Sequence, residues 1–281
     1  RWVVDCDGDL PPSPTNTGFA LDADGGTVQL FDSPARTGGL VDSVTYGPQA
    51  ADLALGRVPD GTGGWTLTQP TPLTGNLAAT LGDASALRIN EWLAASPNAD
   101  DWFELFNPQN QPVALGGLHL SDHPGDRTRF AIAPLSFLGA GADARVVFVA
   151  DDNASRGPSH GNFKLNADGG YLGLYDAVGE RLDAVSFGPQ QSQVSEGRFP
   201  DGSETVVAFA SSVSRGTANW LPLSNVVVNE VLAHTDPPWE DAVEFHNPGD
   251  SPVPLGGWFL SNSEREPRRF RLPDGTILPA R

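Results

Sequence analysis

The sequence contains no methionine and a single cysteine, and it has no apolar run long enough to cross a membrane. Its longest apolar runs, at residues 145–150 and 225–231, have the length of strands, whereas a spanning helix needs about 20 residues. The lone thiol, Cys6, cannot form an internal disulfide or supply a zinc site by itself. Because the chain lacks an initiator methionine, we expect it to be an interior or processed piece of a longer polypeptide.

Positive charge is also scarce. The chain has 17 Lys and Arg residues against 35 Asp and Glu residues, a formal net charge of −18. No basic stripe is available to neutralise nucleic-acid phosphates or anionic lipid, so we expect neither a nucleic-acid partner nor membrane insertion. Glycine and proline are abundant instead, at 32 and 25 residues. This composition is typical of turn-rich β-structure.

Parts of the chain repeat after about 139 residues. Residues 87–91 (LRINE) return as 226–230 (VVVNE), and residues 101–108 (DWFELFNP) return as 241–248 (DAVEFHNP). This period is far above the roughly 20 to 50 residues of solenoid repeats. Each copy is therefore expected to have its own core.

A second set of matches involves the beginning of the chain. Residues 19–26 (FALDADGG) match 163–170 (FKLNADGG), and residues 56–61 (GRVPDG) match 197–202 (GRFPDG). These segments lie downstream of the first set within the repeating unit. The chain thus begins with the second half of a unit and ends with the first half of another.

The matches predict one complete domain flanked by two half-domains of a tandem array. Residues 86–220 are the complete unit, and residues 77–85 are a linker. Residues 1–76 are the C-terminal half of a preceding unit, and residues 226–281 are the N-terminal half of a following one. Whether the two half-domains complement each other stays open at this stage.

Short β-branched or aromatic runs separated by turn dipeptides predict an all-β fold with two packed sheets. No segment has a sustained 3.6-residue period of helical length. The run at residues 146–149 is apolar on both faces, which places it at the centre of a sheet. The expected strands are residues 88–92, 102–106, 113–120, 128–133, 145–150, 162–165, 171–175 and 181–187.

Several of these motifs together resemble the lamin tail domain in its bacterial form. They are INE at residues 89–91, WFELFNP at 102–108, VALGGLHLSD at 113–122, VVFV at 146–149 and LDAVSFG at 182–188. The resemblance implies an immunoglobulin-like β-sandwich without enzymatic activity or catalytic residues. It also implies an accessory module of secreted or surface proteins. No coiled-coil rod accompanies it, so the filament role of the nuclear relatives is not transferred.

Two acidic stretches are candidates for a metal site. Asp5, Asp7 and Asp9 lie on alternate residues, and the matching stretch of the complete unit contains Asp151 and Asp152. Alternating carboxylates resemble the start of a calcium loop, but the required glutamate at its twelfth position is missing. We interpret both stretches as solvated turns at strand ends, with Ca²⁺ as the alternative and no other cofactor expected.

Paired glutamates recur on strands that should be neighbours. Glu91 and Glu104 form one pair, and Glu230 and Glu244 form the other. Two carboxylates at a suitable separation can hydrolyse glycosides. Because tandem structural motifs are commoner than tandem active sites, we interpret the pairs as hydrogen-bond acceptors that stabilise the fold.

Two tryptophans are candidates for a ligand surface. Trp92 and Trp102 stand where the third part of the chain has Val231 and Ala242. An aromatic side chain that varies between copies can serve as an exposed platform for a sugar. Packing in the core or against a neighbouring domain is the other interpretation.

These observations predict a non-catalytic extracellular or cell-surface module with a structural or adhesive role. Its partners would be neighbouring domains of the same longer chain and a surface glycan or protein. Two alternatives remain. The chain is a binding module for glycan or Ca²⁺, or it is an accessory region of a secreted enzyme whose catalytic domain lies outside these residues.

Overall fold

The computed structural model describes residues 1–222, 225–263 and 266–281. In these ranges the regular elements are β-strands and short 3₁₀ helices, and no helix is long and apolar enough to span a membrane. The predicted all-β class is confirmed. The 3₁₀ helices span Ala84–Ala86 (η1), Gly141–Asp143 (η2) and Ala154–Arg156 (η3). The chain forms two compact units, Arg1–Trp220 and Leu221–Arg281.

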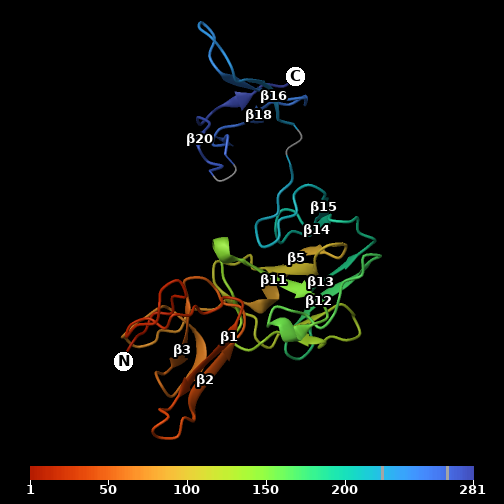
Figure 1. The fold of residues 1–281 in the computed structure, drawn as a ribbon. Helices are drawn as coiled ribbons and strands as arrows, with labels where there is room; N and C mark the ends of the chain where they lie inside the picture. The colour runs from red at the N-terminus through yellow and green to blue at the C-terminus, as the bar shows by residue number, and fades with distance from the viewer. Residues whose placement is uncertain (223–224, 264–265) are drawn as a thin grey trace. The chain divides into compact units, whose positions relative to one another are not determined.

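Two antiparallel sheets form the central domain, which we define as residues 82–220 (Figure 1). The first sheet has the strand order β11, β6, β5, β14, β15, and the second has the order β13, β12, β8, β9. The strands span Arg88–Leu93 (β5), Asp101–Phe106 (β6), Val113–Ala114 (β7), His119–Ser121 (β8), Phe130–Ala131 (β9), Phe137–Leu138 (β10), Arg145–Ala150 (β11), Gly170–Tyr175 (β12), Arg181–Phe187 (β13), Ser195–Arg198 (β14) and Val206–Phe209 (β15). A separate two-stranded ribbon pairs β7 with β10. This arrangement is the predicted immunoglobulin-like sandwich.

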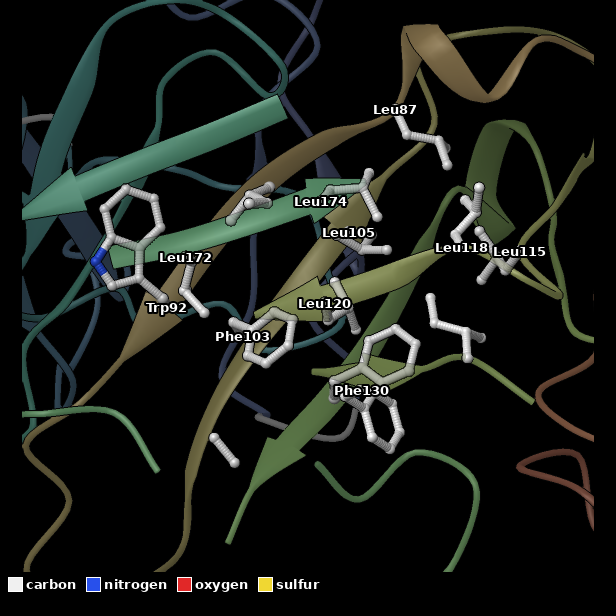
Figure 2. Packing of buried hydrophobic residues seen from close by; sticks show 14 of the residues in the cluster. Leu87, Trp92, Phe103, Leu105, Leu115, Leu118, Leu120, Phe130, Leu172 and Leu174 are labelled. Atoms are coloured by element: carbon white, nitrogen blue, oxygen red, sulfur yellow. The ribbon is translucent and has the colours of Figure 1, made fainter. Parts of the chain in front are cut away.

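The core of the central domain lies between the two sheets (Figure 2). Phe103 of β6 and Leu172 of β12 come from opposite sheets, and both are at most 1% exposed. The ring of Phe103 lies 5.7 Å from that of Phe148 and 6.0 Å from that of Phe163, measured between centroids. Burying each of these side chains stabilises the fold by about 2–3 kcal/mol.

The prediction that residues 146–149 lie at the centre of a sheet is wrong. They belong to β11, the first strand of its sheet. The free edge of β11 is covered by a neighbouring segment, because the Val149 N–H donates to Ser159 O at 2.8 Å and Gly161 N–H donates to Val149 O at 2.7 Å. A covering segment can thus make an edge strand as apolar as a central one.

Residues 1–76, which we call the N-terminal segment, form two hairpins. Their strands span Gly26–Phe31 (β1), Leu40–Tyr46 (β2), Ala54–Val58 (β3) and Gly64–Thr68 (β4). The β1–β2 register matches that of β12–β13, and in both pairs it shifts before the last residue of the first strand. The β3–β4 register likewise matches that of β14–β15, and neither of these pairs has a shift.

The N-terminal segment is anchored on the central domain. The Phe137 N–H donates to Pro48 O at 2.7 Å, and the Gln49 side-chain amide donates to Leu135 O at 2.6 Å. Phe137 also packs in a small apolar cluster with Leu67 of β4. The segment is therefore part of the first compact unit.

Residues 221–281, which we call the C-terminal unit, form three strand pairs within the described ranges. Their strands span Val227–Leu232 (β16), Ala242–His246 (β17), Val253–Pro254 (β18), Phe259–Leu260 (β19), Phe270–Arg271 (β20) and Ile277–Leu278 (β21). β16 pairs with β17, β18 with β21 and β19 with β20. These registers reproduce those of β5–β6, β7–β10 and β8–β9, including the bulge in the first strand.

Candidate functional site

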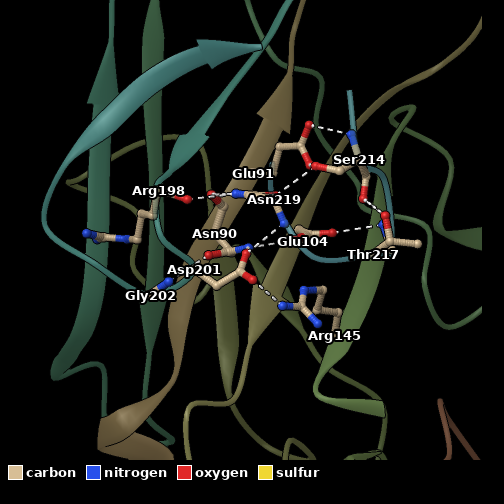
Figure 3. Close-up of polar contacts among 11 residues, drawn as sticks. Asn90, Glu91, Glu104, Arg145, Arg198, Asp201, Gly202, Ser214, Thr217 and Asn219 are labelled. Atoms are coloured by element: carbon tan, nitrogen blue, oxygen red, sulfur yellow. Dashed lines mark hydrogen bonds and ion pairs between the residues drawn. The ribbon is translucent and has the colours of Figure 1, made fainter. Parts of the chain in front are cut away.

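The densest group of buried polar side chains lies where β5 and β6 meet the end of the central domain (Figure 3). Asn90, Glu91 and Glu104 are 0% exposed. The β5–β6 register shifts between Ile89 and Glu91, so a bulge is present here. A bulge re-aims side chains, and it lets consecutive polar residues of β5 reach the same buried site.

Glu91 binds the segment that ends the domain, residues 212–219, which we call the closing segment. One carboxylate oxygen accepts hydrogen bonds from Ser195 Oγ at 2.5 Å and from the Ser214 N–H at 3.1 Å. The other accepts from Ser214 Oγ at 2.8 Å. The first strand of the domain is thereby connected to its last segment.

Glu104 makes a second connection to the closing segment. Its Oε2 accepts from the Gly216 N–H at 2.9 Å, and its Oε1 accepts from the Asn90 side-chain amide at 2.8 Å. Asn90 also donates to Asp201 at 2.9 Å and accepts from the Gly202 N–H at 2.9 Å. Asn90 is thus the central member of this group, with one partner on β6 and two in the turn after β14.

Two arginines compensate part of the buried negative charge. Arg145 forms an ion pair with Asp201. Arg198 pairs with Asp183 at 3.1 Å, and its Nε donates to Ile89 O at 2.9 Å. Because these arginines lie on β11 and β14, the polar group extends across four neighbouring strands of the five-stranded sheet.

Burial changes the proton affinity of both glutamates. Loss of solvation raises the pKa of Glu104 to about 7, against the hydrogen bonds from Asn90 and Gly216 that lower it. Loss of solvation also raises the pKa of Glu91, although the hydrogen bonds from Ser195 and Ser214 oppose the change. Such values suit a general acid, but a substrate has no access to carboxylates that are 0% exposed. The geometry supports the structural interpretation of the pair.

Comparison with family models places this fold in a known group. Residues 82–189 match the model of the Lamin Tail Domain family. Residues 82–189 are a lamin tail domain. The comparisons with curated proteins and with solved structures gave no match.

Lamin tail domains are non-catalytic, immunoglobulin-like domains. The match covers β5 to β13 and ends before β14, β15 and the closing segment. In this chain those last elements complete the polar group around Glu91 and Glu104. The compact unit that contains the matched residues extends beyond them, to Trp220.

The proposed sugar platform on the lamin tail domain is wrong. Trp92 is 1% exposed and Trp102 is 3% exposed, so neither indole offers a face to a ligand. The Trp92 ring packs 5.9 Å from that of Phe187, and the Arg215 guanidinium lies 5.6 Å from the centre of the Trp102 ring. The matching residues of the C-terminal unit, Val231 and Ala242, are smaller and exposed.

The prediction of a turn at a strand end is wrong for residues 5–9, which lie in an irregular stretch before β1 with one isolated bridge from Asp5 to Asn16. Asp7 accepts a hydrogen bond from the Asp9 N–H at 2.9 Å, and Asp5 and Asp9 are exposed. In the described residues no group of three or more His, Cys, Asp or Glu side chains is arranged to hold a metal ion.

The matching turn of the lamin tail domain is tied by an ion-pair cluster. Asp151 lies 2.6 Å from Arg156 and 2.8 Å from His160, whereas Asp152 is exposed. Burial raises the pKa of Asp151, but the hydrogen bonds from His160 and Arg156 outweigh it and leave the pKa below its usual range. The Arg156 and His160 side chains thus already occupy the position that a metal ion would take beside this carboxylate.

Sequence reasoning missed most partners of the two glutamates. Arg198 and Asp201 lie in the repeated GRFPDG stretch, which was not given a role, and Arg145, Ser214 and Asn219 were not singled out. A signal was nevertheless present, because four of these five positions hold the same residue type in the N-terminal segment. The equivalent residues there are Arg1, Arg57, Asp60, Thr71 and Asn76.

Proposed function

We propose that this chain is a non-catalytic structural module of the cell surface or extracellular space, built of lamin-tail-type units in tandem. It separates neighbouring domains of a longer chain and carries adhesive contacts to a surface glycan or protein. The high negative charge keeps such a module soluble and favours cationic partners.

One observation carries this proposal. The most polar motif of the lamin tail domain, Asn-Glu on β5 and Glu on β6, is buried and bound to the closing segment. The two places where the chain enters and leaves the domain are thus joined by hydrogen bonds. Joined ends suit a domain that transmits tension between its neighbours, and a buried motif does not suit an enzyme.

Single-molecule force spectroscopy tests the proposal on the full 281-residue chain, held at its two ends. We expect a discrete unfolding event for the lamin tail domain that releases roughly 45 nm of chain. Glu91→Ala should lower the unfolding force, because it removes the acceptor of Ser195 and Ser214.

Glu230→Ala is the matched control, since Glu230 occupies the same position on β16 but is exposed. It should leave the force of this event unchanged. A chain that extends smoothly without a discrete event, or equal forces for the two variants, would contradict a role in transmitting tension.

A further inference from the structure

A hollow of about 350 Å³ lies on the outer side of the second sheet of the lamin tail domain, and we call it the tyrosine hollow. Its lining residues are Pro124, Arg127, Tyr171, Tyr175, Glu180 and Arg181. All six belong to the stretch that matches the family model. Five of the six carry a polar group, so the hollow suits a polar ligand and not an apolar one.

The alternation of side chains along β12 turns two tyrosines toward this hollow. Leu172 and Leu174 point into the core. Tyr171 and Tyr175 alternate with them and therefore point to the opposite face of the sheet. Their hydroxyl oxygens lie 2.7 Å apart. Because each hydroxyl has one proton, one of the two donates the bond between them and the other keeps its proton free for a further acceptor.

Gly173 allows the two tyrosine rings to come together. A Cβ at this position would lie 2.6 Å from Tyr175 Cε2 and 2.8 Å from Tyr171 Cε1, so a larger residue would force the rings apart. A glycine inside a strand costs stability and often marks the close approach of another group. The strand pair itself does not require it, because Gln29 stands at the matching position of β1, a strand without tyrosine. The arrangement is therefore specific to the lamin tail domain of this chain.

Two arginines bring positive charge to the tyrosine hollow. Arg127, in the loop between β8 and β9, places its guanidinium 5.9 Å from the centre of the Tyr175 ring. It also donates to Gly179 O at 3.1 Å, which holds it beside the turn between β12 and β13. Arg181 is the exposed first residue of β13. In the described ranges neither arginine forms an ion pair with an acidic side chain, so both charges are available to a ligand.

The turn between β12 and β13 adds a hydrogen-bond acceptor and holds it in place. The Asp176 carboxylate accepts hydrogen bonds from the Val178 N–H at 2.9 Å and from the Glu180 N–H at 2.8 Å. The Asp176 N–H donates to Glu180 O at 2.9 Å. These bonds fix the backbone from which Glu180 and Arg181 project. A site that is formed in advance loses less conformational entropy when a ligand binds.

The Tyr175 hydroxyl stays protonated at neutral pH. Burial and the hydrogen bond with Tyr171 raise the pKa of Tyr175 to about 12, although the charges of Arg127 and Arg181 lower it. Because both arginines influence this hydroxyl, both guanidiniums lie near it. The tyrosine pair is therefore a hydrogen-bond donor beside two cations.

We propose that the tyrosine hollow binds a uronic acid residue of a surface glycan, an inference that rests on the function proposed above. The sugar carboxylate accepts hydrogen bonds from the guanidiniums of Arg127 and Arg181 and from the tyrosine pair. Guanidinium groups match the planar carboxylate, to which they donate charge-assisted bonds. A ring hydroxyl of the sugar donates to the Glu180 carboxylate.

The mixed lining favours an acidic sugar over other anions. A doubly charged phosphate would be repelled by Glu180, whereas a uronic acid carries one negative charge and also supplies hydroxyl donors. A volume of about 350 Å³ is near the lower end for ligand sites, which suits a single sugar residue. The formal net charge of −18 does not prevent binding, because exposed charges more than about 8 Å away are largely screened at physiological ionic strength.

Isothermal titration calorimetry of the full 281-residue chain tests this proposal with short oligomers of galacturonate, glucuronate and mannuronate. We expect at least one of them to bind saturably and the neutral oligomers of galactose, glucose and mannose not to bind. Arg127→Gln and Arg181→Gln should each weaken binding about tenfold, because each removes a charge-assisted donor. Tyr171→Phe should weaken binding about fivefold, because it removes a neutral donor and keeps the ring.

Arg215→Gln is the matched control. Arg215 is an exposed arginine of the same domain and does not line the tyrosine hollow. This variant loses the same charge and should bind the acidic oligomer like the unmodified chain. Arg127 and Arg181 are also exposed, so the circular dichroism spectrum should stay the same in all three arginine variants.

Three results would overturn the proposal. They are an absence of binding by all three acidic oligomers, equal binding of the neutral oligomers, and equal weakening by Arg127→Gln and Arg215→Gln. The titration is made without load on the chain, so these results leave the expected unfolding event of the tension-bearing module untouched. Smooth extension under force, with binding of the acidic oligomer intact, would instead contradict the proposed function alone.

Discussion

The hairpins β5–β6 and β16–β17 carry the same motif in the same register but have different surroundings. Both have Asn-Glu on the first strand, Glu on the second and a bulge at the same place. In the lamin tail domain all three side chains are fully buried. In the C-terminal unit the same three positions are exposed.

The difference shows which properties belong to the hairpin itself. The strand pairing, the bulge and the hydrogen bond between the asparagine and the second glutamate occur in both copies, so they need only local sequence. Burial of the glutamates occurs only where β14 and the closing segment cover them. The shifted pKa of Glu104 is therefore a property of the cover and not of the motif.

The largest expected effect is a loss of stability when a core side chain of β5–β6 is shortened, compared with the same change at the exposed matching position of β16–β17. Phe103→Ala should lower the free energy of unfolding of the lamin tail domain by about 3–5 kcal/mol, because it leaves a cavity beside Phe148 and Phe163. Val243→Ala, at the matching position and 39% exposed, should change stability by less than about 0.5 kcal/mol. Hydrogen exchange resolved by peptide measures both, and equal losses of protection in the two hairpins would contradict the comparison.

A smaller effect is expected at the arginine that pairs with an aspartate at matching positions of the lamin tail domain and the N-terminal segment. Arg198→Ala should cost about 3 kcal/mol, since the Arg198 side chain is 5% exposed and its loss leaves the largely buried Asp183 carboxylate without its cation, with the Ile89 N–H as a remaining donor. Arg57→Ala should cost at most about 1 kcal/mol, because Asp42 is 55% exposed. The free energies come from exchange of the β13 and β2 amides, and a cost for Arg57 equal to that for Arg198 would contradict the comparison of an exposed pair with a buried one.

The smallest effect is a pH dependence specific to the covered hairpin. Glu104 has a pKa of about 7 in the folded domain and an ordinary value of 4.5, so between these values the native state binds more protons than the unfolded one. Stability should therefore rise as the pH falls from about 7 to about 4.5, by about 2 kcal/mol from this group.

Glu104→Gln should reduce this rise, whereas Glu244→Gln, outside the lamin tail domain, should leave it intact. Exchange of the β5 and β6 amides at several pH values gives the comparison. An identical pH dependence for the two variants would show that Glu104 is not the group that takes up the proton.

Much of the architecture could be predicted from the sequence because it depends on local pattern. Alternating β-branched and aromatic residues between turn dipeptides predicted most strands of the central domain. The expected strand at 162–165 is wrong, the expected strand at 113–120 is two strands, and β10, β14 and β15 were not predicted. The motif around Asn90 and the two glutamates was also visible, and its structural role agrees with the geometry. These features persist in both copies of the hairpin, whatever covers them.

Exposure could not be predicted in the same way. Trp92 and Trp102 looked like candidates for an open platform because their counterparts are small, yet both are buried. β11 looked central because it is apolar on both faces, yet it is an edge strand covered by the Ser159–Gly161 stretch. Residue type alone does not tell which segment, distant in sequence, will lie on a given face.

The sequence by itself determined the all-β class, most of the strands and the correspondence between repeated segments, since these depend on side-chain alternation and turn residues close along the chain. Only the tertiary structure decided that Glu91 and Glu104 are buried, because their donors come from residues more than 100 positions away. It also decided that the matching glutamates of the C-terminal unit are exposed. A carboxylate loses its water only when another segment replaces that water with hydrogen-bond donors.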